Sequence, residues 1–69
     1  MTRKDYILIA AALKEAREAI KEKEPDGTAE FEALLDGVAY VAAYLSDALG
    51  RANPCFDRER FLRAAGVQS

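Results

Sequence analysis

The residue types that most often carry out chemistry in proteins are scarce in this chain. It has no histidine and one cysteine, Cys55, among its 69 residues. Histidine is the commonest general base, and a thiol without an imidazole partner or another activating group is a weak nucleophile. A conventional zinc site needs several cysteine or histidine ligands. We therefore predict that the protein is not an enzyme and has no metal site and no cofactor.

The acidic residues of the first third suggest no active site either. Glu15, Glu18, Glu22 and Glu24 alternate with lysines and an arginine, a pattern that is typical of a solvated helix surface. The chain has no glycine-rich phosphate loop and no serine in a nucleophile-elbow context. These absences favour a binding protein over a catalyst.

Two arginines near the carboxyl terminus could contact an anion. Arg60 and Arg63 are three residues apart, so they share a face of a predicted helix over 58–65. Arginine suits bidentate recognition of phosphate and carboxylate groups. The alternative is that both belong to a solvated surface and pair with Asp57 and Glu59. The sequence leaves both interpretations open.

Three helices are predicted to position these side chains, and the first spans 3–23. Thr2 and Asp5 match a capping box at its start, and a turn at 25–27 follows its end. Its apolar residues recur at spacings of three and four, which is a helical period. They are Tyr6, Ile9, Leu13, Ala16 and Ile20.

The second predicted helix, over 28–49 with Gly50 as its terminator, is apolar on more than one face. One stripe consists of Phe31, Leu34, Val38, Val41, Leu45 and Ala48, widened by Leu35, Ala42 and Leu49. Another consists of Ala33, Gly37, Tyr40 and Tyr44. Together they are wider than the face that one antiparallel neighbour covers.

The second stripe is the candidate interface. Tyr40 and Tyr44 lie four residues apart, and the small residues Ala33 and Gly37 beside them would let another helix approach closely. Aromatic residues are enriched as anchors of protein interfaces. We predict an interface formed by Ala33, Gly37, Tyr40, Val41 and Tyr44, with an ordinary core packed under the third helix as the alternative.

The third helix has signals at both ends. Asp57 is a good N-cap, and Phe56 precedes it in position to contact Phe61. Gly66 stands where a left-handed C-cap is expected, with Leu62 and Val67 placed for the accompanying contact. We predict a helix over 58–65.

These elements predict one all-α domain over 1–69, a long antiparallel helical hairpin with a short third helix across one end. Chains of this size bury only about 60% of the surface that they expose when unfolded, so they need additional stabilisation. One cysteine excludes an intramolecular disulfide. A partner chain remains as the source of additional stabilisation, and we predict a homodimer formed through the second helix.

Charge and hydropathy indicate a cytoplasmic protein without a membrane span. The basic and apolar start resembles a secretion signal, but Lys14 and Glu15 interrupt it, so we interpret it as mature protein. No apolar run approaches the roughly 20 residues of a membrane helix. The net charge of −2 argues against binding to duplex DNA, and residues 25–50 contain five acids and no basic residue.

Both ends of the chain resemble a group of small helical proteins encoded by bacteriophages and prophages. The start TRKDY and the end NP.FDRERFL.AAG match this group, and the resemblance covers 2–13 and 44–66. Cys55 departs from the pattern, since a charged residue is commoner there. The group has no assigned activity, so the resemblance implies a phage context and no site residues.

Three functions are compatible with these observations. The first is a noncatalytic phage accessory protein that binds a host protein, such as an enzyme, a regulator or a defence complex, as an interaction or inhibitor module. The second is a small oligomer that sequesters a phosphate-bearing nucleotide signal, with Arg60, Arg63 and either Arg3 or Lys4 as anion contacts and a tyrosine for aromatic stacking. The third is a DNA-binding regulator, which the acidic composition disfavours.

Overall fold

The three helices begin at residues whose side chains satisfy free backbone groups. In the computed structural model, which describes residues 2–24 and 27–67, the helices are α1 (Arg3–Lys23), α2 (Ala29–Ala52) and α3 (Arg58–Ala64). Thr28 Oγ1 accepts a hydrogen bond from the Phe31 N–H at 3.1 Å, and Asp57 Oδ1 accepts one from the Arg60 N–H, also at 3.1 Å. The described residues contain no strand, so the all-α class is confirmed.

The end of α2 differs from the prediction. The helix continues through Gly50 to Ala52, and Asn53 follows as its C-cap. A Cβ atom on Gly50 would lie at an ordinary contact distance of 3.5 Å from the Arg58 side chain, so neither termination of the helix nor close packing requires a glycine here. The Asn53 side chain donates a hydrogen bond to Tyr6 Oη at 3.1 Å, which ties the end of α2 to the start of α1.

The predicted ends of α3 are confirmed in detail. Gly66 adopts a left-handed conformation with φ of 79°, and the Val67 N–H donates to the Leu62 carbonyl at 3.1 Å, as in a Schellman cap. The rings of Phe56 and Phe61 lie 5.4 Å apart, which is the predicted contact across the start of the helix.

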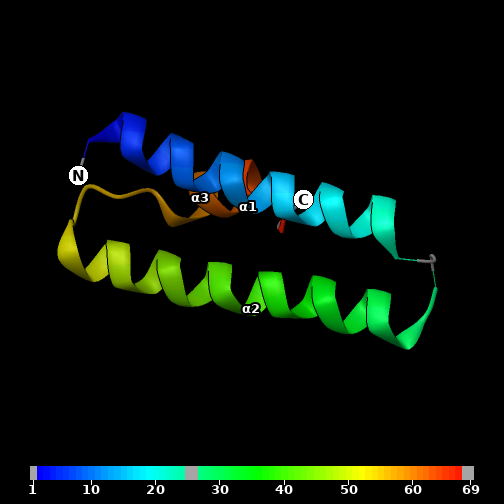
Figure 1. Cartoon of the computed structure of the whole chain (residues 1–69). Helices are drawn as coiled ribbons and strands as arrows, with labels where there is room; N and C mark the ends of the chain where they lie inside the picture. Colours follow the sequence, from blue (N-terminus) through cyan, green and yellow to red (C-terminus); the bar gives the residue numbers. More distant parts are fainter. Residues whose placement is uncertain (1, 25–26, 68–69) are drawn as a thin grey trace.

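The helices form a small bundle in which each one contacts the other two. Figure 1 shows α1 and α2 side by side, with α3 behind them toward the end of the molecule where the chain starts. Of the turn predicted at 25–27, Gly27 has a positive φ of 82°, and the other two positions lie outside the described residues. The radius of gyration is 12.7 Å, compared with about 11 Å expected for a compact chain of this length, because the bundle is elongated.

The buried core is composed mainly of small side chains. Ala10 of α1, Ala42 and Ser46 of α2, and Ala65 after α3 are almost fully buried. Phe61 joins Ala10 and Ala65 in one cluster, which half-buried larger residues surround. Small side chains let the helices approach closely, but they contribute little apolar area to the core.

The inward stripe predicted for α2 is partly wrong. Leu34, Val41 and Ala48 are exposed, and Ala16 of the stripe predicted for α1 is exposed as well. The buried or half-buried apolar residues of α2 are Phe31, Leu35, Val38, Ala39, Ala42, Leu45 and Leu49. The buried side of α2 is the one that packs against both α1 and α3, and the side chains of Leu34, Val41 and Ala48 lie outside it.

Candidate functional site on the outer face of α2

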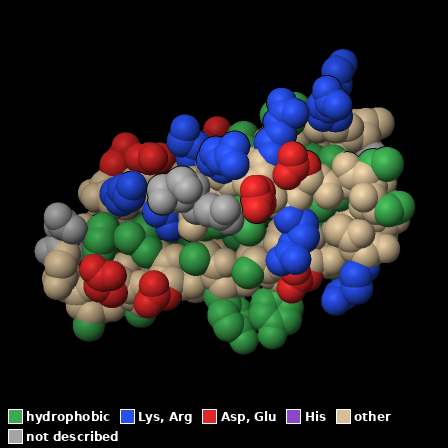
Figure 2. Space-filling model, turned by 180° about the vertical axis from the view of Figure 1, so that it is seen from behind, with side chains coloured by type: hydrophobic (Ala, Val, Ile, Leu, Met, Phe, Trp, Pro, Cys, Tyr) green, Lys and Arg blue, Asp and Glu red, His purple; other side chains and the backbone are tan. Residues whose placement is uncertain are grey.

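The most prominent surface feature is a row of exposed apolar side chains along α2. Four large ones are exposed by 45% (Leu34), 66% (Tyr40), 52% (Val41) and 61% (Tyr44). Exposed small residues complete the row, which we call the α2 face: Ala33, Leu34, Gly37, Tyr40, Val41, Tyr44 and Ala48. All five residues predicted for an interface belong to it. In Figure 2, hydrophobic side chains protrude at the lower edge, along α2.

The α2 face has the spacing of a helix-packing seam. Leu34, Val41 and Ala48 are seven residues apart, and Gly37 and Tyr44 fall between them, so the spacings alternate between three and four. Such a seam is the pattern that packs against another helix in coiled coils. It lies outside the surfaces that α2 uses to contact α1 and α3. Within the chain, therefore, α2 has one packing surface more than its neighbours cover.

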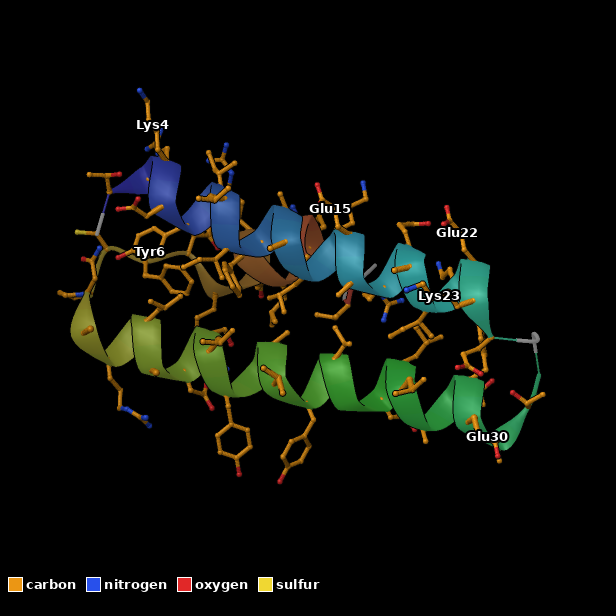
Figure 3. The ribbon with its side chains drawn as sticks, viewed as in Figure 1. Lys4, Tyr6, Glu15, Glu22, Lys23 and Glu30 are labelled. Carbon is orange, nitrogen blue, oxygen red and sulfur yellow. The ribbon has the colours of Figure 1, made fainter. Side chains whose placement is uncertain are left out.

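The two tyrosines form a pair at the centre of the face. Their ring centroids are 5.0 Å apart, and their hydroxyl oxygens lie 3.4 Å apart, within hydrogen-bonding distance. This hydrogen bond between the two hydroxyls, with smaller contributions from burial and from the charge of Asp47, raises the pKa of Tyr44. Figure 3 shows ring side chains projecting from the middle of α2, away from α1. The two rings therefore form one continuous aromatic surface.

Gly37 leaves a recess in the α2 face. A Cβ atom built at this position would meet nothing within 4 Å, so no neighbour within the chain requires a glycine here. Glycine in a helix costs about 1 kcal/mol relative to alanine. We predicted that Gly37 lets another helix approach closely, but no helix of the described residues approaches it.

A separate pocket of about 290 Å³ lies where α1, α3 and the segment between α2 and α3 meet. Arg3 and Arg60 line it together with the apolar side chains of Ile7 and Phe61. The carboxylate of Asp57 also lines it and offsets part of the positive charge. Figure 3 shows Tyr6, another lining residue, directed from α1 toward the end of α2.

The two predicted anion contacts are not brought together at this pocket. Arg60 lines it, whereas Arg63 is exposed and is not part of its wall. The second arginine at the pocket is Arg3, which starts α1 and was one of the further anion contacts predicted beside Arg60. Arg58 forms an ion pair with Asp47 of α2, so it joins α3 to α2 and leaves no free charge for a ligand.

The structure assigns no reactive environment to Cys55. The residue is exposed, and its N–H donates a hydrogen bond to Asn53 Oδ1 at 3.1 Å. Within residues 2–24 and 27–67, no group of three or more acidic or cysteine side chains is placed to hold a metal ion. In the same residues, no helix combines the length and hydropathy that crossing a membrane requires.

Three features escaped the sequence interpretation. Leu34 and Ala48 were assigned to the inward stripe. Together with Val41 they are spaced seven residues apart, and Gly37 and Tyr44 fall between them, which is the spacing of a packing seam. Ile7 and Leu8 are exposed by 58% and 69% on α1, where they interrupt the helical period. The pocket depends on long-range packing, so no local signal indicated it. Comparisons of the chain with protein-family models, with curated proteins and with solved structures find no match.

Proposed function

We propose that this protein is a noncatalytic interaction module that forms a homodimer through the α2 face and binds a host protein as a phage or prophage accessory factor. The observation that carries the proposal is the exposure of Leu34, Tyr40, Val41 and Tyr44 in one row. Contiguous exposed apolar patches on small proteins mark interaction sites. The resemblance of both chain ends to phage proteins supports a host protein as the second partner.

The chemistry of the chain supports a role without catalysis. It has no histidine, and its one cysteine is exposed beside no imidazole. Proteins that bind stoichiometrically need a complementary surface and no reactive group. The α2 face supplies such a surface, and its aromatic pair is the type of anchor that dominates interface energies.

Substitution within and beside the face tests the proposal. Tyr44→Arg places a charge at the centre of the face, so we expect it to convert the dimer into a monomer in sedimentation velocity. Ala43→Arg adds the same charge at an exposed position of α2 outside the face and should leave the dimer intact. If both variants and the unmodified chain all sediment as monomers, the result contradicts the proposal.

The host partner is tested with the same two variants. In a homodimer the α2 face is covered, so a bacterial protein contacts the remaining surface of α1 and α3. We expect the Ala43→Arg dimer to bind a purified host partner as tightly as the unmodified chain does. A partner that prefers the Tyr44→Arg monomer would contradict the assignment of the face to self-association.

The pocket favours a second candidate function, binding of a small phosphate-bearing nucleotide. Two arginines, Arg3 and Arg60, stand at an apolar and aromatic wall where a base could stack. A ligand that binds only the folded state raises the thermal midpoint by mass action. We expect a nucleotide to raise it for the unmodified chain and for Arg63→Gln, but not for Arg60→Gln. No shift across a nucleotide panel would exclude this function.

The third candidate, DNA binding, has the least support. Lys and Arg side chains gather over α1 and α3 in Figure 2, but the chain as a whole carries a net charge of −2. DNA affinity dominated by phosphate contacts falls steeply with salt. Absence of DNA retardation at low salt would exclude it.

A further inference from the structure

Four residues of α2 stand seven positions apart along the outer side of the helix. They are Glu30, Gly37, Tyr44 and Arg51, and all four are exposed. Residues at this spacing follow one line along a helix, with a drift of about 20° per seven residues. The line therefore carries an acid at one end, a base at the other, and a recess and a large ring between them. Figure 3 shows Glu30 in the first turn of α2, on the side away from α1.

Within the described residues, all four positions are exposed and the packing between helices leaves them uncovered. Over residues 2–24 and 27–67, the structure has one ion pair, Asp47 with Arg58, which involves neither Glu30 nor Arg51. The recess at Gly37 has no neighbour within 4 Å. Tyr44 contacts Tyr40 of the same helix and is otherwise exposed. The groups are thus available to a partner.

We propose that the partner covering the α2 face is a second copy of this chain whose α2 runs antiparallel, with the two-fold axis near Tyr40 and Val41. Glu30 of each copy then faces the partner's Arg51, and Gly37 of each copy receives the partner's Tyr44. The inference rests on the proposed function, since it names the occupant and direction of the same face.

The line of four residues is complementary to itself only when reversed. Positions 30 and 51, and positions 37 and 44, are equidistant from a point between Tyr40 and Val41, so reversal pairs acid with base and recess with ring. A parallel pair would place Glu30 against the partner's Glu30 and Arg51 against the partner's Arg51. It would also align the two helix dipoles, which antiparallel helices oppose. Like charges that face each other select against the wrong arrangement.

The exposed surface of the chain has the size that such a dimer needs. Its accessible surface is 4979 Å². A folded monomer of 7.6 kDa is expected to expose about 4,300 Å². The difference of about 700 Å² is close to the roughly 800 Å² that each partner buries in a stable interface of standard size. The α2 face contributes to this excess, together with the elongated shape of the bundle.

The native Cys55 gives a direct test of direction without any substitution. It is exposed and lies three residues beyond the end of α2, outside the α2 face. We would attach a spin label to Cys55 and measure the distance between labels by double electron–electron resonance, at a concentration where light scattering shows dimer. The 24 residues of α2 span about 36 Å at 1.5 Å per residue.

The two directions give separate distances. An antiparallel pair places the labels at opposite ends of the helix pair, so we expect a distance of about 36 Å or more. A parallel pair places both labels at the same end, where only the width of the dimer separates them, so a distance clearly shorter than about 36 Å would overturn the inference. In that outcome the dimer, and with it the proposed function, would stand. A chain that stays monomeric would overturn both.

Charge reversal provides the second test. Glu30→Arg and Arg51→Glu, each alone, place like charges across both ends of the dimer, and we expect each to raise the dimer dissociation constant about three- to tenfold. The two substitutions together restore both pairs in reverse and should return the constant to within about twofold of its original value. Glu32→Arg is the matched control, since it removes an acid from the same first turn off the line of the four residues. An equal effect of Glu32→Arg, or no recovery in the double variant, would contradict the pairing.

Discussion

At the scale of single residues, Gly37 carries a conformational cost that no contact within the chain offsets. Glycine loses more backbone freedom on folding than any other residue, and a Cβ atom here would meet open space. The reason for a glycine therefore lies outside the isolated chain. The antiparallel partner supplies one, because its Tyr44 would occupy the recess.

Substitution of Gly37 separates its effect on the stability of the monomer from its effect on the dimer. We expect Gly37→Ala to raise the free energy of unfolding by about 1 kcal/mol, since alanine is the better helix former and has space. The measurement is urea unfolding in the Tyr44→Arg background, which removes dimerisation. In the otherwise unmodified chain the same substitution should weaken the dimer. A decrease in the stability of the monomer would show that Gly37 is needed within the chain.

The tyrosine pair predicts a specific pH dependence. The hydrogen bond with Tyr40 raises the pKa of Tyr44, because it stabilises the neutral phenol of Tyr44 in the folded state. Its stabilising contribution is complete below the ordinary pKa of about 10 and is lost as the pH rises through the raised pKa. We expect Tyr40→Phe to lower the pKa of Tyr44, measured by NMR titration of its ring carbons. An unchanged pKa would show that the two hydroxyls do not interact.

Gly66 predicts a loss of stability that depends on backbone conformation. Its φ of 79° is left-handed, and a Cβ atom would lie at an ordinary distance of 3.5 Å from the Arg17 side chain. The cost of Gly66→Ala therefore comes from the backbone, and we expect about 1 kcal/mol in thermal or urea unfolding. Gly66→Asn is the control, because asparagine tolerates this conformation and should cost less. Equal stability of Gly66→Ala and the unmodified chain would contradict the cap.

At the scale of elements, the position of α3 depends on small side chains beneath it. Ser46 is fully buried, and its hydroxyl donates to the Ala43 carbonyl of its own helix at 2.9 Å. The hydroxyl therefore has its hydrogen-bond partner within its own helix. What the bundle requires at this position is small volume, as it does at Ala10, Ala42 and Ala65.

Two substitutions of Ser46 distinguish volume from hydrogen bonding. Ser46→Leu overfills a closely packed site, and we expect it to lower the free energy of unfolding by about 1–3 kcal/mol. Ser46→Ala keeps the volume and should change stability by less than about 0.5 kcal/mol. Denaturant unfolding of both variants is the measurement. A larger loss for alanine than for leucine would show that the hydroxyl matters more than the space.

The ends of the helices were predictable from sequence because local hydrogen bonds determine them. Thr28 was placed at the start of the second helix, Asp57 as an N-cap and Gly66 as a C-cap, and each role depends on residues within four positions. The end of α2 was not predictable in this way. The helix continues through Gly50 to Ala52, although a glycine near the end of an apolar pattern is a usual signal for termination.

The candidate site was only partly predictable for a similar reason. Tyr40, Tyr44 and Gly37 stood out by type and spacing, and the structure places them on one exposed face. Leu34 and Val41 look like core residues in any sequence, and the packing of α1 and α3 together determines which side of α2 is buried. The pocket beside Arg3 and Arg60 joins the two ends of the chain, so it required the complete fold.

At the scale of the whole molecule, the chain folds into an elongated bundle with a thin core and one uncovered face. Its largest almost fully buried side chain, below 2% exposure, is Ser46, whereas four large apolar side chains of α2 are exposed. A chain of 69 residues has little surplus stability. Covering the α2 face would bury apolar area that the single chain leaves in water, so dimerisation adds to stability as well as to function.

The most direct test of dimerisation is the solution mass of the unmodified chain, measured by light scattering coupled to size exclusion over a wide range of concentrations. The chain has a mass of 7.6 kDa, so a homodimer gives about 15 kDa. We predict the higher value at high concentration, with a transition toward the lower one on dilution. A mass of one chain at every concentration would contradict self-association through the α2 face.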